Sequence, residues 1–381
     1  MKGHYETVII GGGIAGLACA RHLHDNGRSF LLITENVGGR VRTSKDGTIN
    51  LGAYYVKGDY GHVNEFVDRG RRIRRQDILR GQPDGSFTRT DIVVVFHPFQ
   101  AFRFLRFMRR FRRHYEAFKR NCLVMSQADA IRADPQLNRL YHEPAPQLIE
   151  RLRIEDIAQS YLAPAATGTA FTSLNRLTAL TLIVGVLPLI TRIYEYRFRF
   201  DRLTAGFDES LEIDSVTAVA ALVDGGYAIN VRSGGAFTAD NVVVATPIGV
   251  SAALIALPEV KEPIDAHMFV IEGRLRSPWD RASFSLFPDG DATLAIARQV
   301  GGSILFCSTS TEPDFGRYFS RWEVAEYLHW NPAFNLVGDS LIECNQGPGL
   351  YVIGDHNVCD LEDAFITGMY AAGQVVAMAG T

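Results

Sequence analysis

The stretch VIIGGGIAGLACARHL, residues 8–23, decides the fold. Its β-branched apolar run ends in three glycines and turns directly into an alanine-rich stretch with helical spacing, which predicts a buried parallel strand followed by a helix. In such a β-α-β unit the first glycine permits a tight turn, the second lets the backbone approach a pyrophosphate, and the third allows close packing of helix on strand. The helix N-terminus then faces the phosphates. The residues expected around a bound dinucleotide are Gly11, Gly13, Ile14, Ala15 and Gly16.

A second glycine pair indicates which dinucleotide cofactor the protein binds. The strand SFLLIT is followed by ENVGGRVRT, which places Gly38, Gly39 and Arg40 just beyond it. A nicotinamide-binding fold does not need this second pair, whereas a protein with an elongated FAD does, because the chain passes close to the pyrophosphate again. Arg40 can supply a cation there. Glu35 follows the first motif at the distance expected for the acidic residue at a ribose.

Three blocks, in this order, resemble the signature of the FAD-dependent amine oxidase superfamily, which includes amine oxidases, protoporphyrinogen oxidase and phytoene desaturase-like enzymes. They are VIIGGGIAGLACARHL…ENVGGRVRT…NLGAYYV, then EIDSVTAVAALVDGGYAINVRSGGAFTADNVVVATP at 212–247, and GLYVIGDHNVCDLEDAFITGMYAAGQVV at 349–376. Their order and spacing are more specific than any single motif.

The resemblance implies an α/β fold in which a discontinuous, Rossmann-like FAD-binding domain carries an inserted α+β substrate domain. The FAD-binding domain would comprise about residues 1–57, 200–250 and 340–381, and the substrate domain 58–199 and 251–339, with a helical part at about 98–199.

The resemblance also implies roles for individual residues. Asp355 would accept a hydrogen bond from the ribityl chain, and Val216 would contact the adenine through its backbone. The helix N-terminus at residues 363–365 would point N–H groups at the electron-rich edge of the flavin, where a helix N-terminus stabilises negative charge. The segment 52–54 would run past the isoalloxazine. The residues assigned in this way are Gly52, Ala53, Tyr54, Val216, Gly354, Asp355, Asp363, Ala364 and Phe365.

Two features depart from the family. Thr34, rather than Glu35, falls at the family's usual count, which shifts the expected ribose contact by one residue. The amine oxidases usually carry a lysine in the substrate domain that holds a water near the flavin, and the strand expected at 267–276 contains none. The sequence therefore favours, over amine oxidation, the dehydrogenation or desaturation of a hydrophobic small molecule, neutral or anionic, by hydride transfer to the flavin.

Catalytic candidates follow from their place near these motifs, because flavin chemistry asks little of the protein beyond binding, orientation and electrostatics. Tyr55 adjoins the segment at the isoalloxazine, Tyr327 and Trp330 precede the C-terminal motif, and His356 follows its aspartate. A place in the core explains each aromatic residue equally well. Cys359 is expected to be a small buried residue rather than a covalent flavin link, so the FAD is expected to be non-covalent.

Two other functions stay open. A flavin-dependent isomerase or mutase with no net redox change would use the same fold, although the UDP-galactopyranose mutases usually carry asparagine where Arg40 stands. A non-catalytic lipid- or partner-binding protein on the same scaffold is the second alternative. The intact glycines, Glu35, Arg40 and Asp355 argue against it.

Residues 69–120 are strongly basic, with 15 Lys and Arg against four acids in a chain of net charge −3. Within them, residues 98–120 combine an apolar stripe at helical spacing with arginines on the other faces. Three interpretations stay open: a core-packed helix with a solvated face, an anionic membrane surface, and an anionic soluble partner. No nucleic-acid partner is expected, since nothing else resembles a nucleic-acid module.

Bulk features bound the remaining possibilities. The five cysteines are scattered with no C-x-x-C pair, so neither a disulfide framework nor a metal site is indicated. The first strand is expected by about Thr7, which leaves no room for a signal peptide. The longest uncharged run, 177–191, is too short to span a bilayer and predicts a buried helix or pocket wall. We expect a cytoplasmic protein, with peripheral membrane contact only through residues 98–120. The pattern does not specify its oligomeric state.

Overall fold

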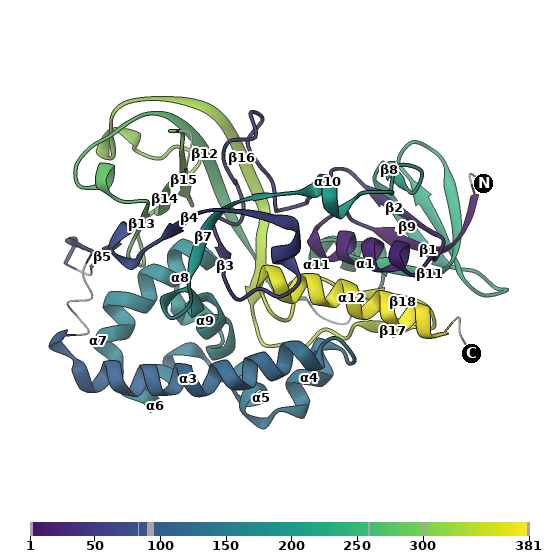
Figure 1. The fold of residues 1–381 in the computed structure, drawn as a ribbon, viewed down its shortest axis with the longest axis horizontal. Helices are drawn as coiled ribbons and strands as arrows, with labels where there is room; N and C mark the ends of the chain where they lie inside the picture. The colour runs from purple at the N-terminus through teal and green to yellow at the C-terminus, as the bar shows by residue number, and fades with distance from the viewer. Residues whose placement is uncertain (1–2, 83, 90–94, 258–259, 300–301, 379–381) are drawn as a thin grey trace.

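The computed structural model describes residues 3–82, 84–89, 95–257, 260–299 and 302–378. Within them, eight strands form one sheet that carries the N-terminal motif (Figure 1). Its order is β17-β18-β11-β1-β2-β8, and β10 and β9 continue from β11 in antiparallel pairing. The strands are β1 (Gly3–Ile10), β2 (Phe30–Thr34), β8 (Leu211–Ile213), β9 (Val216–Ala221), β10 (Tyr227–Val231), β11 (Ala236–Val244), β17 (Asn345–Gly347) and β18 (Leu350–Val352).

Strand β1 lies in the middle of this sheet and is buried by both neighbours and both faces. Val8 is in parallel register with Val242 of β11 and Leu31 of β2. Ile9 packs on the side of α1 and α12, whereas Val8 and Ile10 pack on the side of α11 and the β9–β10 hairpin. Burial on both faces explains the continuous apolar run in the sequence. The helices on this sheet are α1 (Ile14–Asp25), α11 (Ile248–Leu254) and α12 (Leu361–Met378).

A second sheet lies beside the first and reaches over a layer of helices (Figure 1). In the described chain its order is β16-β12-β15-β14-β13-β5-β6, and β3, β7 and β4 form a separate three-stranded sheet. The strands are β3 (Val56–Lys57), β4 (Val67–Ile73), β5 (Ile78–Gly81), β6 (Phe87–Thr88), β7 (Ile193–Phe198), β12 (Glu262–Leu275), β13 (Phe284–Leu286), β14 (Thr293–Arg298), β15 (Ile304–Ser308) and β16 (Phe319–Val337).

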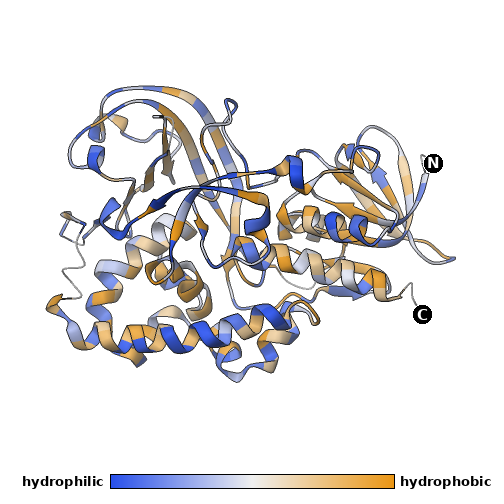
Figure 2. Ribbon diagram, viewed as in Figure 1, coloured by the Kyte–Doolittle hydropathy of each residue, from blue (hydrophilic) through white to orange (hydrophobic). Residues whose placement is uncertain are grey.

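The helical layer shares one large core with the inner face of this second sheet. Figure 2 shows the apolar residues gathered between the two, with α3 along the outer edge of the molecule. The helices are α3 (Pro98–Asn121), α4 (Gln127–Ala133), α5 (Pro135–His142), α6 (Ala145–Leu152), α7 (Glu155–Ile157), α8 (Ala163–Ala170), α9 (Ala179–Gly185) and α10 (Phe200–Leu203). Short turns of 3₁₀ or π helix are η1 (Val63–Phe66), η2 (Arg75–Asp77), η3 (Ala158–Leu162), η4 (Leu174–Arg176), η5 (Leu187–Leu189), η6 (Trp279–Arg281) and η7 (Phe315–Arg317).

The predicted α/β class is confirmed, and so are the hairpin and returning strand within 212–247. The exact domain limits stay a prediction. The helical part ends earlier than about residue 199, because 193–198 form β7 between β3 and β4. Its sequence IYEYRF is rich in β-branched and aromatic residues, which favour a strand.

Among the described helices, none combines the length and the apolar character needed to cross a bilayer.

Candidate functional site

The two glycine loops lie against each other at the N-terminus of α1. Gly13 and Gly38 form an isolated parallel bridge, and the Gly38 N–H donates to the Gly12 carbonyl oxygen at 2.8 Å. A Cβ added at Gly39 would lie 2.9 Å from Cα of Gly13. Gly38 and Gly39 both have positive φ angles, +100° and +56°, which favour glycine. The second pair is therefore what allows this loop to close on the first.

Gly13 leaves room for a ligand, whereas its neighbours do not. A Cβ at Gly11 would lie 2.8 Å from the Ala245 carbonyl oxygen, and one at Gly16 would lie 2.0 Å from that of Gly11. A Cβ added at Gly13 would lie 4.0 Å from the Ala245 carbonyl oxygen, the nearest heavy atom outside its own helix and chain neighbours. The φ angle of Gly13 is an ordinary −71°. Gly13 caps α1 without a side chain, so N–H groups of the first turn are left for a partner. This cradle fits a pyrophosphate.

Arg40 joins three of the segments that the sequence assigns to the cofactor. Its Nη2 forms an ion pair with Oδ1 of Asp355 at 2.6 Å, and its Nη1 donates to the Ala333 carbonyl oxygen at 2.8 Å. Gly52 packs on Arg40 so closely that an added Cβ would lie 1.8 Å from the arginine carbonyl oxygen. Burial acts to raise the pKa of Asp355, but the charge and hydrogen bond of Arg40 lower it overall. The carboxylate therefore stays ionised.

The residues expected at the adenosine half meet at one edge of the first sheet. Oγ1 of Thr34 accepts the Gly12 N–H at 2.8 Å, so this hydroxyl is committed to the glycine loop. The next residue, Glu35, accepts a hydrogen bond from Ser215, which directly precedes Val216 at the start of β9. The Thr34 hydroxyl is therefore used within the glycine loop, and Glu35 supplies the carboxylate that lies beside the start of β9.

The first turn of α12 is largely bonded within the protein. The Tyr115 hydroxyl of α3 donates to Oδ2 of Asp363, and the Ala364 N–H donates to the Asp360 carbonyl oxygen at 3.0 Å. Burial and the nearby charge of Asp360 raise the pKa of Asp363 well above its usual range. Phe365 lies in the core around α1 and α12. Asp363 thus links α12 to the helical layer, a contact that the sequence did not predict.

Glu362 fixes the start of α12 against the loop that follows β3. Its buried carboxylate accepts the N–H groups of Gly61, His62 and Val63 at 2.7, 2.8 and 3.0 Å. An acidic residue in the first turn also suits the helix dipole. The start of α12 is therefore held by α3 through Asp363 and by the loop after β3 through Glu362.

An apolar cavity opens beside Tyr54 and Tyr55. Its volume is about 550 Å³ when the open solvent at its mouth is included. Burial raises the pKa of both phenols, so they stay protonated. The uncharged run 177–191 is confirmed as a wall of this cavity. The lining residues are Tyr54, Tyr55, Arg75, Ile78, Arg80, Ala165, Thr169, Gly185, Val186, Pro188, Leu189, Ile193, Phe284 and Leu286.

The other catalytic candidates lie apart from this lining. Tyr327 is 49% exposed on the edge strand β16, and its hydroxyl lies 2.9 Å from Nδ1 of His267. Trp330 packs half-buried against the main core. His356 is buried, and burial lowers its pKa to about 4, so the imidazole is neutral at neutral pH. The structure therefore brings Tyr55, but not Tyr327, to the cavity.

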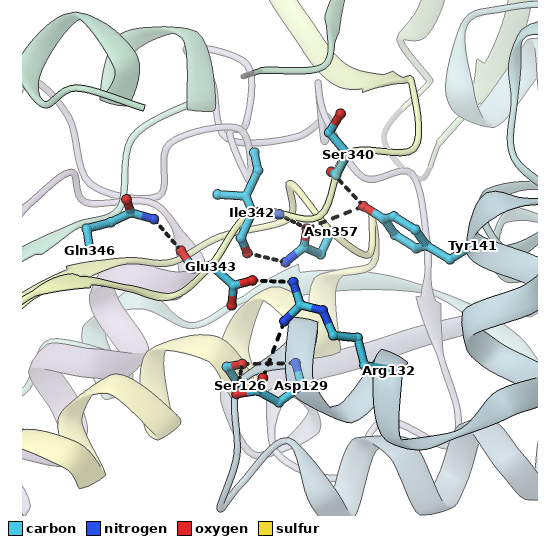
Figure 3. Close-up of polar contacts among 9 residues, drawn as sticks. All are labelled: Ser126, Asp129, Arg132, Tyr141, Ser340, Ile342, Glu343, Gln346 and Asn357. Carbon is cyan, nitrogen blue, oxygen red and sulfur yellow. Dashed lines mark hydrogen bonds and ion pairs between the residues drawn. The ribbon is translucent and has the colours of Figure 1, made fainter. Parts of the chain in front are cut away.

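Asn357 holds the loop after the Gly354–Asp355 motif in place (Figure 3). Its Oδ1 accepts the Ile342 N–H at 3.0 Å, and its Nδ2 donates to the Ile342 carbonyl oxygen at 2.8 Å. The Tyr141 hydroxyl of α5 donates to Oδ1 of Asn357 at 3.3 Å and to the Ser340 carbonyl oxygen at 3.1 Å. Nothing in the local pattern pointed to Asn357, because its partners lie far away in the sequence.

Arg132 of α4 adds a second link to the same segment (Figure 3). It forms ion pairs with Glu343 and, at 3.4 Å, with Asp129 of its own helix. The helical layer therefore holds the segment that leads into the C-terminal motif.

Lys261 is a buried cation that the sequence analysis did not select. It directly precedes β12, which begins earlier than the strand expected at 267–276. Its Nζ lies 4.6 Å from the centre of the Tyr141 ring. Burial lowers the pKa of Lys261 to about 8, although Cys359 and Asp355 act to raise it. A readily deprotonated amine thus lies within electrostatic reach of the C-terminal motif.

Comparison with known proteins assigns the sequence to a family. The model of the family described as flavin containing amine oxidoreductase matches residues 14–283. Flavin-containing amine oxidase B of Bos taurus is 35% identical over 68 residues, and that of Canis lupus familiaris is 39% identical over 61. These matches cover 16% and 15% of this chain, and only 13% and 12% of the relatives' own length.

Solved structures share the fold over nearly the whole chain. Wild-type putrescine oxidase bound to putrescine has a TM-score of 0.67 at 14% identity, covering 98% of this chain and 99% of that one. An oxidoreductase from Methanosarcina mazei has a TM-score of 0.63 at 14% identity, covering 95% and 98%. The expected resemblance to this family is confirmed, and these structures show the same fold. This chain belongs to the flavin-containing amine oxidoreductase family.

Proposed function

We propose that this protein binds FAD non-covalently and dehydrogenates or desaturates a hydrophobic small molecule. The observation that carries the proposal is the apolar cavity beside Tyr54 and Tyr55, at the end of the segment that the family resemblance assigns to the isoalloxazine. When bound, FAD supplies an acceptor for the hydride removed from substrate carbon. The Gly13 cradle would hold its pyrophosphate, and Asp355, oriented by Arg40, would hold its ribityl chain.

The cavity supports a substrate that is largely apolar, because aliphatic and aromatic side chains make up most of its wall. Two arginines, Arg75 and Arg80, are also among the lining residues; Arg75 donates to the Leu189 carbonyl oxygen, and the Arg80 guanidinium lies 4.2 Å from the centre of the Tyr161 ring. Arginine binds carboxylates in a two-pronged geometry, so we extend the proposal to a hydrophobic substrate that carries an acidic group. The protonated phenols of Tyr54 and Tyr55 would orient it and exclude water.

The experiment is anaerobic mixing of the purified holoprotein with a panel of hydrophobic compounds in matched neutral, carboxylate and amine forms. Bleaching of the flavin absorbance by a compound, fastest for the carboxylate form, is expected. Acid precipitation should leave all flavin in the supernatant. A protein that is colourless and cannot be reconstituted with FAD would refute the proposal. Turnover without flavin bleaching under single-turnover conditions, and without acceptor consumption, would instead identify a mutase.

A cavity-filling variant separates substrate binding from cofactor binding. A Cβ added at Gly185 would meet only Oγ1 of Thr169, at 3.7 Å, so the side chain of Gly185→Leu would enter the cavity. We expect normal flavin content and a KM raised about tenfold, in line with an obstructed contact. Gly249→Leu, on α11 with open space around it, is the matched control and should leave KM unchanged.

A further inference from the structure

Helix α3 has two opposite faces, and only one of them is used by the fold. The apolar stripe that raised the membrane hypothesis is mostly buried: Phe104, Met108, Phe111, Tyr115 and Phe118 all lie in the main core. Membrane insertion of that stripe is therefore excluded, because the helical layer already covers it. The opposite face remains uncovered along the edge of the molecule (Figures 1 and 2).

The outer face begins with exposed aromatic rings. Phe99 and Phe102, three residues apart and so on one side of the helix, are 79% and 63% exposed. Val95 and Phe96, which precede the helix by three and two residues, are each 75% exposed. Large apolar side chains rarely gather in this way on a soluble surface without a partner.

The same face continues as a row of arginines. Arg106, Arg109, Arg110 and Arg113 follow Phe102 at spacings of three and four residues and are all exposed. In the part of the chain that the structure describes, none of the four forms an ion pair, whereas the neighbouring Arg112 pairs with Asp59. Their charge is therefore available to an anionic surface.

We propose that this outer face, Phe99, Phe102, Arg106, Arg109, Arg110 and Arg113, docks the protein on an anionic lipid bilayer. The exposed rings would enter the interfacial layer, and the arginines behind them would bind lipid phosphates. Charge alone would suit any polyanion. The adjacent aromatic rings favour a bilayer, because a purely electrostatic partner gives them nothing to enter. This proposal does not depend on the proposed reaction.

The test is co-sedimentation of the full-length holoprotein with vesicles of phosphatidylcholine alone and of phosphatidylcholine mixed with phosphatidylglycerol. Binding to the mixed vesicles only, weakening with salt, is expected. Arg106→Gln with Arg109→Gln should weaken binding about tenfold or more, since each arginine near the surface contributes to the attraction. Arg274→Gln with Arg321→Gln, which removes the same charge from β12 and β16, should not change it.

A second pair of variants tests the aromatic rings. Phe99→Ser with Phe102→Ser should also lower binding to the mixed vesicles several-fold, whereas Val223→Ser, which removes a fully exposed apolar side chain elsewhere, should not. Unchanged thermal unfolding and flavin content show that each variant is folded. Equal binding to neutral vesicles, no binding at all, or a phenylalanine pair that binds like wild type would each overturn the proposal. The last result would point to a soluble polyanion.

Discussion

Substitution of Gly13 by alanine separates the folding role of the glycine loop from its binding role. The added Cβ would be 4.0 Å from the Ala245 carbonyl oxygen, so the fold has room for it. The φ angle of −71° is also one that alanine adopts readily. Alanine is a poorer helix cap than glycine, which costs up to about 1 kcal/mol. We expect Gly13→Ala to lower the melting temperature of the apoprotein by no more than about 4 °C.

The cost to cofactor binding should be larger, because the methyl group occupies the space assigned to the pyrophosphate. Inserting one such group into a packed contact costs about 1–3 kcal/mol, which weakens binding about 5- to 150-fold. The assay is titration of apoprotein with FAD, followed by quenching of flavin fluorescence, alongside thermal unfolding without FAD.

Gly16→Ala is the matched control for this argument. Its Cβ would lie 2.0 Å from the Gly11 carbonyl oxygen, so the strand and helix must move apart. We expect the apoprotein itself to lose stability in that variant. If Gly13→Ala binds FAD like wild type, or if it destabilises the apoprotein as much as Gly16→Ala does, the assignment of the pyrophosphate to Gly13 is wrong.

Three further outcomes are expected. Lys261→Met should stabilise the protein most below pH 8, by about 3 kcal/mol at the limit, because the folded state binds the lysine proton less tightly than the unfolded chain does. Between pH 8 and 10.5 the wild-type protein itself gains stability, so the advantage of the variant should shrink. Urea unfolding across that pH range measures the difference. A gain independent of pH would contradict this. Tyr141→Phe should cost about 1–2 kcal/mol and weaken FAD binding a few-fold, since Asn357 loses a donor; unchanged affinity would show that this bond does not position the C-terminal motif. Cys359→Ser should release the same amount of flavin on acid precipitation as wild type, and flavin that stays with the wild-type pellet alone would reveal a covalent link.

The cofactor end of the site could be predicted because its geometry is local. Gly16 packs on the Gly11 carbonyl oxygen within one β-α-β unit. Gly11 and Gly13 follow from the same glycine spacing, although the atom that each lies nearest is the Ala245 carbonyl oxygen just after β11. The second pair, Gly38 and Gly39, was predicted from the need for a second close approach, and the structure shows that approach as a backbone bridge.

The remaining contacts could not be predicted, because they join residues that are distant in sequence. Arg40 was expected at the pyrophosphate, yet its partner in the structure, Asp355, is 315 residues away. Asn357 and Lys261 are isolated polar residues with no distinguishing pattern. For α3 the apolar stripe was predicted correctly, but the sequence left open whether the protein core or a membrane surface covers it, and only the packing against the helical layer decides this.

The distant contacts explain why cofactor and substrate parts must be considered together. Tyr115, on the inner face of α3, donates to Asp363 in the first turn of α12, the helix that the family resemblance places at the flavin. Tyr141 of α5 does the same for the loop that carries Asp355, through Asn357. Helices α3 and α5 thus bound the core and also each fix one end of the C-terminal motif. Because the outer face belongs to the same helix as Tyr115, a surface bound there is connected to the start of α12 through the Tyr115–Asp363 hydrogen bond.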